Sequence, residues 1–362
     1  MGIDMDALGS ASAWSRPLRV GLIAPPWLPV PPVGYGGIET IVNVLARGLV
    51  DHGHEVVLFA AADSTCPVEL RSAIGPAPGV DVGGSAVEIH HAVSAYESLR
   101  DVDVIHDHTA VGPLVAFAER RGNVVTTNHN PFSPPYGSGF AVVSRSVAVV
   151  AISHHQASTA RDVAIAEVIH HGLDPDAFPV GKGSGGTLVF LGRMSPSKGP
   201  DRAIAIARAA GVPIVLAGKQ HTDAERDFFE AKIRPELGRD VTFVGELGPI
   251  DKMALLGDAV ALINPISWDE PFGMVMVEAL ACGTPVLAFG RGAAPEIVSP
   301  GITGFLANDD AGLIDAIKRL DELDRAACRA AVEGHFSADR MVEDYVALYD
   351  RVVAGDVPGL PR

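Results

Sequence analysis

The sequence predicts an α/β fold in which two doubly wound, Rossmann-like domains face a central cleft. Short apolar segments alternate with segments of helical periodicity in each half of the chain, a rhythm typical of parallel sheets. A Gly-rich stretch without periodicity, residues 179–186, separates the halves, and 362 residues suffice for two domains. Such sheets bind ligands beyond the carboxyl ends of their strands, so we expect the functional site in the cleft.

The first half begins with an apolar run, residues 18–24, that ends before Pro25 and is typical of a strand buried on both faces. Apolar residues at helical spacing from Ile38 to Leu49 then predict a helix that ends near Gly53. We therefore expect a flexible tail over residues 1–17 and a first domain over residues 18–178. Further strands are predicted at 55–61, 103–106, 123–127, 147–152 and 166–169.

The second half restarts the same pattern, which predicts a second domain over residues 187–338. Its expected strands are 187–191, 213–217, 241–244, 259–264 and 285–289, and its expected helices are 200–210, 223–237, 251–256 and 274–282. A final apolar stripe predicts a helix over 341–353. The segment 339–362 could return to the first domain.

Composition indicates a globular protein of the cytoplasm. Hydrophobic residues make up 48% of the chain and charged residues 20%, and no apolar run reaches the roughly 18–20 residues that span a bilayer. The start of the chain lacks the pattern of a secretory signal, and the three cysteines show no paired spacing. A net charge of −16 opposes nucleic acid as a partner, whereas peripheral membrane contact through a local basic patch stays open.

Two glutamates flank a predicted helix start in the second half. The strand 259–264 leads into a loop that contains Glu270, and the helix 274–282 carries Glu278. Free N–H groups at a helix start favour an oxygen-rich ligand, and the helical rise puts the glutamates about 10–12 Å apart. Alternatively, Glu270 favours the helix dipole and Glu278 pairs with an arginine. We favour a ligand site because an unpaired buried carboxylate is costly.

A second loop carries fixed positive charge. Arg193 and Lys198 lie between the strand 187–191 and the helix 200–210. Cations placed there could stabilise the negative charge that develops on a leaving diphosphate. Taken alone, such a loop is more often a solvated surface feature.

A Gly-rich turn follows the first strand, where Gly36 and Gly37 permit close approach of the backbone to a phosphate. One alternative is a flexible turn. Another is a dinucleotide site of a dehydrogenase, with Asp63 on the ribose. The third glycine of that fingerprint falls at Glu39, which opposes the dehydrogenase.

Taken together, these motifs resemble the retaining glycosyltransferases of family 4, which have the GT-B fold. Glu270 to Glu278 resembles the family's E-x7-E motif, and Arg193 to Lys198 resembles its G-R-x4-K-G motif. The runs 283–286 and 295–298 continue the likeness, while His171-Gly172 stands where members often have Asn-Gly. The resemblance covers nearly the whole chain from about residue 18.

The resemblance implies a role for each of these positions. Glu270 would contact hydroxyls of the donor sugar, and Glu278 would contact the ribose. The loop backbone would hold the sugar. The cations and the glycines would hold the diphosphate. The donor-binding residues expected in this way are Gly36, Gly37, Arg193, Lys198, Glu270, Phe272, Gly273, Met274 and Glu278. The first domain would then be the acceptor side, and the second would bind the nucleotide sugar.

Thirteen histidines raise the question of a metal. Neighbouring residues of a strand point to opposite faces, so the doublets at 90–91, 154–155 and 170–171 are poor candidates. His106 and His108 share a side and could bind a metal or line the cleft; we favour lining because no third ligand is identifiable. We expect no metal and no cofactor. His129 resembles the family's histidine near the reacting sugar, which places it with Glu270, Arg193 and Lys198 as catalytic.

The expected function is transfer of a sugar from a UDP- or GDP-linked donor to an unknown acceptor hydroxyl, with retention at the anomeric carbon. The loop 131–140, beside His129, is expected to shape the acceptor pocket, and residues 245–249 to border the base. The alternatives are a same-fold epimerase or phosphorylase, a catalytically silent nucleotide-sugar-binding subunit and, more weakly, the dehydrogenase. The intact Glu270, Arg193 and Lys198 argue against a silent subunit.

Overall fold

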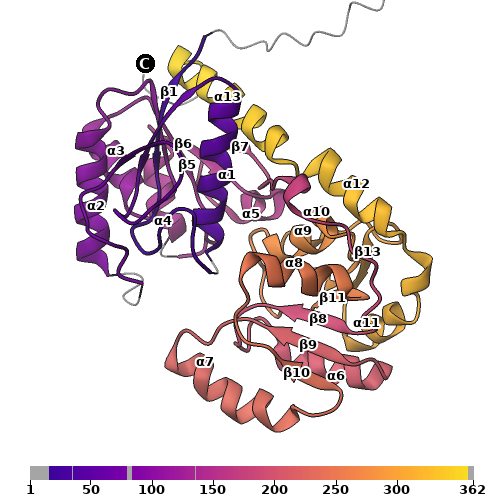
Figure 1. Cartoon of the computed structure of the whole chain (residues 1–362). Helices are drawn as coiled ribbons and strands as arrows, with labels where there is room; N and C mark the ends of the chain where they lie inside the picture. Colours follow the sequence, from indigo (N-terminus) through magenta and orange to yellow (C-terminus); the bar gives the residue numbers. More distant parts are fainter. Residues whose placement is uncertain (1–15, 35, 80–83, 135, 358–362) are drawn as a thin grey trace, which may run out of the picture.

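The computed structural model describes residues 16–34, 36–79, 84–134 and 136–357, and these form two α/β domains, each built on one parallel sheet (Figure 1). The first sheet has seven strands in the order β3-β2-β1-β4-β5-β6-β7, and the second has six in the order β10-β9-β8-β11-β12-β13. The expected tail falls almost entirely on residues 1–15, which lie outside the described residues.

In the first domain the strand order changes direction beside β1, where β1 pairs with both β2 and β4. The loops after β1, β4 and β5 therefore open at one edge of the sheet, which is where such folds bind ligands. The strands are β1 (Arg19–Ile23), β2 (Glu55–Phe59), β3 (Glu69–Arg71), β4 (Val104–Asp107), β5 (Val124–Thr127), β6 (Ala148–Ala151) and β7 (Ile165–Val168). The helices are α1 (Gly37–Asp51), α2 (Ser85–Ser98), α3 (Gly112–Glu119), α4 (Tyr136–Val143) and α5 (His154–Thr159).

The second domain repeats this arrangement around β8. Its strands are β8 (Leu188–Leu191), β9 (Ile214–Ala217), β10 (Val241–Phe243), β11 (Ala261–Asn264), β12 (Val286–Phe289) and β13 (Gly304–Ala307). Its helices are α6 (Pro200–Ala210), α7 (Asp223–Phe228), α8 (Pro249–Asp258), α9 (Met274–Ala281), α10 (Ala294–Ile297), α11 (Asp310–Ile317) and α12 (Arg325–His335). The helix expected over 223–237 is α-helical only as far as Phe228. A π turn and a 3-10 turn follow, the latter containing Pro235, which lacks the N–H that an α-helix needs.

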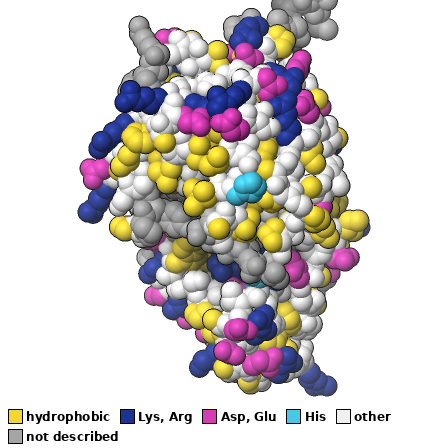
Figure 2. Space-filling view, turned by 90° about the vertical axis from the view of Figure 1, so that its left-hand side faces the viewer, with side chains coloured by type: hydrophobic (Ala, Val, Ile, Leu, Met, Phe, Trp, Pro, Cys, Tyr) yellow, Lys and Arg dark blue, Asp and Glu magenta, His cyan; other side chains and the backbone are white. Residues whose placement is uncertain are grey.

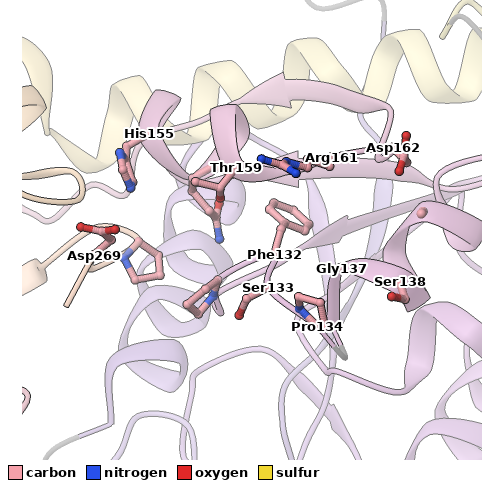
Figure 3. Close-up of a pocket in the computed structure, with 14 residues that line it drawn as sticks. Phe132, Ser133, Pro134, Gly137, Ser138, His155, Thr159, Arg161, Asp162 and Asp269 are labelled. Carbon is pink, nitrogen blue, oxygen red and sulfur yellow. The ribbon is translucent and has the colours of Figure 1, made fainter.

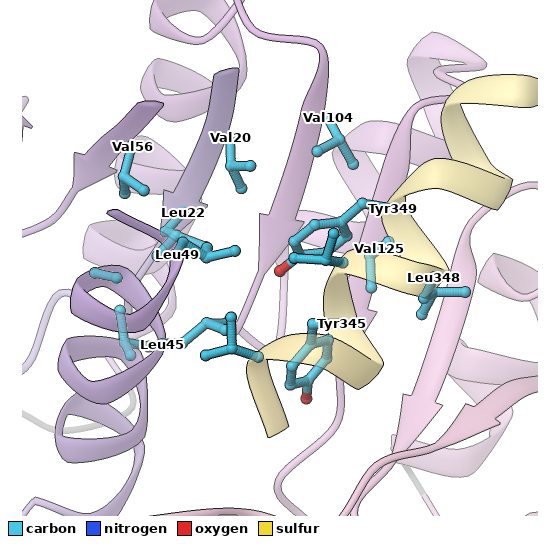
Figure 4. Packing of buried hydrophobic residues seen from close by; sticks show 14 of the residues in the cluster. Val20, Leu22, Leu45, Leu49, Val56, Val104, Val125, Tyr345, Leu348 and Tyr349 are labelled. Atoms are coloured by element: carbon cyan, nitrogen blue, oxygen red, sulfur yellow. The ribbon is translucent and has the colours of Figure 1, made fainter. Parts of the chain in front are cut away.

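The last helix, α13 (Ala338–Ala354), leaves the second domain and packs beside α1 on the first sheet (Figures 1 and 4). Tyr345 and Tyr349 are fully buried there among apolar side chains of β1, β4 and β5. The Tyr349 hydroxyl lies 2.7 Å from Nδ1 of His106, and the Tyr345 hydroxyl 2.8 Å from that of Thr127. The end of the chain thus completes the core of the domain that begins it.

Replacing Tyr349 with phenylalanine is expected to lower the free energy of unfolding by about 1–3 kcal/mol, because the buried Nδ1 of His106 loses its hydroxyl partner. Urea unfolding of the full chain would measure the difference. Val353→Ala, at a 39% exposed position of the same helix, is the control and should stay within about 0.5 kcal/mol of wild type. Equal stability of the two variants would contradict a contribution from this hydrogen bond.

Figure 2 shows the face of the first domain that carries α2 and α3. Large apolar side chains are exposed there, among them Ile89 and Val93 of α2 and Leu114 of α3. Basic and acidic side chains are interspersed along the upper part of this face, so it offers a polyanion no continuous basic surface. Within the described residues, no helix combines the length and apolarity that crossing a membrane requires.

Candidate active site

A cavity of about 200 Å³ lies between the two domains, and both contribute to its walls. It collects nine of the ten site residues expected from the sequence, and Arg193 lines a smaller adjoining cavity of about 50 Å³. The two cavities share five lining residues, including Gly192, Lys252 and Glu278. The nine comprise Gly36, Gly37 and His129 from the first domain and Lys198, Glu270, Phe272, Gly273, Met274 and Glu278 from the second.

An ion pair lines the cavity of about 200 Å³. Nζ of Lys198 lies 2.5 Å from Oε1 of Glu270 and 5.2 Å from the centre of the Trp268 ring. Both members of the pair are largely buried, with side chains 11% and 15% exposed. The other carboxylate oxygen, Oε2 of Glu270, is buried and accepts no hydrogen bond from the described chain. A buried acceptor of this kind is ready to receive a ligand hydroxyl.

The backbone around Glu270 is fixed by glycines. Gly292, at φ +56°, packs so closely that a Cβ there would lie 2.4 Å from both N and O of Glu270. The N–H of Ala293 also donates to the Glu270 carbonyl at 3.0 Å. Gly273, at φ 103°, then allows the loop to turn into α9. The position of the Glu270 carboxylate therefore depends on the absence of a Cβ at Gly292 and Gly273.

The Gly292→Ala substitution should lower kcat/KM for the sugar transfer expected from the sequence by about 100-fold, because the new Cβ must displace the Glu270 backbone, and a shift of about 1 Å can have that effect. Gly290→Ala is a matched control, since Gly290 is exposed and its Cβ would meet no atom within 4 Å. Steady-state kinetics on both variants, with melting temperatures, would separate a catalytic loss from unfolding. Equal kcat/KM in the two variants would contradict the argument.

Glu278 is buried and pairs with a lysine, not with the arginine considered from the sequence. Nζ of Lys252, on α8, lies 2.6 Å from its Oε1. This pair accounts for the burial of the carboxylate and leaves it on the cavity wall. Arg193 is held in turn by Glu225, whose Oε1 accepts from the guanidinium at 2.9 Å. Lys198, Lys252 and Arg193 therefore spread positive charge along the two cavities.

His129 faces these groups from the first domain. Burial lowers its pKa to about 3, so the ring is neutral at physiological pH. Its Nε2 lies 3.0 Å from Nδ1 of His108, whose own Nε2 is buried without a partner in the described structure. An unpaired N–H is rarer in proteins than an unpaired acceptor, so we assign the shared proton to Nδ1 of His108. His129 then keeps its proton on Nδ1, where it can donate to a ligand.

His106 and His108 correct an expectation from the sequence. They do lie on one side, with ring centres 4.0 Å apart, but both are buried and neither lines the cleft. His106 bonds to Tyr349 and Thr127, so it belongs to the contact with α13. The alternation of side chains along a strand places residues 106 and 108 on the same face of the sheet, but it does not determine which element packs against that face.

The sequence did not single out His171, Lys252 and Trp268, which also line the cavity of about 200 Å³. The ring of His171 stacks on that of His129 at 5.1 Å. His171 occupies the position where the chain departs from the Asn-Gly of the resembling family, and this departure was the available signal. Lys252 and Glu278 lie on different helices, so no short-range spacing in the sequence predicts that they pair.

A third cavity, of about 490 Å³, adjoins the first, and Pro271 lines both (Figure 3). Residues 131–134, 137 and 138 form one wall and α5 with the following turn forms another, while Asp269 faces them from the second domain. The lining mixes Phe132 and prolines with hydroxyl, amide and charged side chains, among them Arg161. The cavity can therefore take a polar molecule in contact with the first cavity.

Comparison with known proteins assigns a family to this arrangement. Residues 178–332 match the family described as "Glycosyl transferases group 1", and residues 35–177 match "Glycosyltransferase Family 4". The chain belongs to the group 1 glycosyltransferases of family 4. A D-inositol 3-phosphate glycosyltransferase of Mycobacterium marinum is 28% identical over all of this chain and 91% of its own length.

Solved structures agree with the fold of this glycosyltransferase. AviGT4, a glycosyltransferase involved in avilamycin A biosynthesis, has a TM-score of 0.70 and 28% identity, covering 94% of this chain and 99% of its own. HepE of Anabaena, solved with UDP and glucose, has a TM-score of 0.71 and 20% identity over 92% and 99%. The chain thus has the expected GT-B fold and is a transferase, which overturns the dehydrogenase alternative. Asp63, on which that alternative relied, is exposed and bonds to the Ala77 N–H.

Proposed function

We propose that this glycosyltransferase moves a sugar from a nucleoside diphosphate sugar, UDP- or GDP-linked, to an acceptor hydroxyl with retention at the anomeric carbon. The observation that carries the proposal is the largely buried Lys198–Glu270 pair, whose second carboxylate oxygen is unpartnered at the cavity. A sugar hydroxyl satisfies that oxygen, and a phosphate satisfies the adjacent ammonium.

The remaining groups suit the rest of such a donor. Gly36 and Gly37 begin α1, so N–H groups of a helix start face the cleft where a diphosphate would lie. Glu278 can receive ribose hydroxyls, and Phe272, Gly273 and Met274 border the sugar. Arg193 and Lys252 add positive charge toward the nucleotide end. These cations can stabilise the leaving diphosphate, so we propose catalysis without a metal or cofactor.

The acceptor would enter from the larger cavity of Figure 3, since it meets the donor cavity at Pro271. In the step that follows, the bond from the anomeric carbon to the diphosphate oxygen breaks and a bond to the acceptor oxygen forms. The acceptor proton passes to the departing phosphate. Neutral His129 donates a hydrogen bond near the reacting sugar and is not the base, because its pKa is about 3.

A panel of UDP- and GDP-sugars tests the proposal through slow donor hydrolysis, with the released sugar observed by NMR. Retention predicts that an α-linked donor first yields the α-anomer. The rate should fall in Glu270→Ala and should not change with EDTA. Release of the β-anomer would contradict retention, and binding of every donor without turnover would contradict transfer.

The same panel separates the enzyme alternatives. An epimerase would return a donor with an altered sugar, and a phosphorylase would form sugar 1-phosphate when inorganic phosphate is added. Either product, formed at a rate above that of hydrolysis, would replace the proposed transfer reaction. A rise in melting temperature with one donor would identify the base and sugar that the cavity prefers.

A further inference from the structure

Three side chains that can ligate a metal meet where the domains touch, outside the donor cavity. His154 begins α5 of the first domain, His170 follows β7, and Glu296 lies on α10 of the second domain. One ligand atom from each lies within 4.8 Å of the others, and the described residues contain no second group of this kind. None of the three lines the donor cavity or the cavity of about 490 Å³ shown in Figure 3.

The distances are close to those that a bound ion requires. Nε2 of His170 lies 2.7 Å from Oε2 of Glu296, and the rings of His154 and His170 are 5.6 Å apart at an interplanar angle of 71°. Tetrahedral ligands about 2.0–2.2 Å from a zinc ion stand roughly 3.3 Å from each other. His170 and Glu296 need to separate by only a fraction of an ångström. His154 is exposed, so its side chain is free to turn toward them.

The carboxylate of Glu296 is already oriented by groups that a metal would not displace. Its Oε2 accepts from the backbone N–H of His154 at 2.9 Å, and its Oε1 from that of His155 at 2.7 Å. Hydrogen bonds of this kind commonly fix the carboxylates that bind metals. An ion would replace only the hydrogen bond between His170 and Glu296.

We propose that His154, His170 and Glu296 bind one divalent ion of the zinc class, with water in the fourth position. Two imidazoles and a carboxylate suit zinc or cobalt rather than magnesium or calcium, which prefer oxygen ligands alone. The ion joins α5 of one domain to α10 of the other, so it acts as a clamp between domains. The doublets 154–155 and 170–171 each contribute one histidine, although neither lies in a strand: the first begins α5 and the second follows β7.

The test uses metal-free full-length protein without a polyhistidine tag. Titration calorimetry with Zn²⁺ should show one ion per chain, Co²⁺ should give the visible absorption of a tetrahedral site, and Zn²⁺ should raise the melting temperature. His154→Ala removes an exposed side chain and should fold normally, yet it should weaken zinc binding at least about 100-fold, as should His170→Ala.

His90→Ala is the matched control, because His90 is an exposed histidine on α2, outside the group. It should bind zinc as tightly as wild type. Zinc binding that is equal in wild type, His154→Ala and His170→Ala would overturn the proposal, as would wild-type protein that binds no Co²⁺ or Zn²⁺. These readouts do not depend on turnover, so failure here leaves the sugar-transfer proposal unaffected.

Discussion

Lys198→Ala is expected to lower kcat/KM for sugar transfer by about 100- to 1,000-fold, the usual effect of removing one group that stabilises developing negative charge. Lys198 lies 2.5 Å from Glu270 on the floor of the donor cavity and supplies the ammonium nearest the proposed sugar. Its loss also leaves the carboxylate of Glu270 largely buried and unpaired. Both the affinity for the donor and the turnover rate should therefore fall.

Lys318→Ala is the control for this experiment. Lys318 also pairs with a carboxylate, Asp315, but both side chains are mainly exposed, so its removal should change kcat/KM and stability little. Initial rates over a range of donor concentrations would separate kcat from KM. If both variants retain wild-type kcat/KM, Lys198 does not assist departure of the diphosphate.

Mild acid is expected to remove the stability that buried neutral histidines contribute, beginning below about pH 6.5. Burial lowers the pKa of His129 to about 3 and that of His91 to about 4, and it holds the pKa values of His106 and His108 well below their ordinary range. The unfolded chain binds these protons near pH 6.5, whereas the folded chain does not. Stability is therefore complete above pH 6.5 and falls as the pH drops toward the folded-state values.

The size of this effect follows from the same shifts. At pH 5.5 a buried histidine that stays neutral, such as His91 or His129, contributes roughly 1.4 kcal/mol less to stability than at neutral pH. Urea unfolding between pH 7 and 5 would measure it. His91→Gln should reduce the slope by about 1.4 kcal/mol per pH unit, whereas His90→Gln, on the exposed neighbour, should not. An unchanged slope in His91→Gln would contradict neutral burial of this histidine.

Much of the fold was predictable because its signals are local. Buried parallel strands are apolar runs, and the strands expected from 18–24 to 285–289 correspond to strands of the structure. The edge strands β3 and β13 were not predicted, and neither were the helices α2 to α5 and α10 to α12. The three residues of β3 carry little pattern, and α2 and α3 lack a clear apolar stripe.

The site was predictable only where family motifs are contiguous. The loops around Arg193, Lys198, Glu270 and Glu278 could be named from the sequence, and the structure brings them together at one cleft. Their roles in transfer stay predictions. His171, Lys252 and Gly292 contribute through distant partners, and nothing in their sequence neighbours indicates which atoms they meet.

The sequence by itself determined the two-domain α/β architecture, the family and the charged loops, because each depends on residue type and short-range spacing. The tertiary structure alone decided that Lys252 neutralises Glu278, that His108 stands behind His129, and that α13 returns to the first sheet. It also decided that His154, His170 and Glu296 meet. These contacts join residues far apart in the chain, and only the packing of sheets and helices sets their distances.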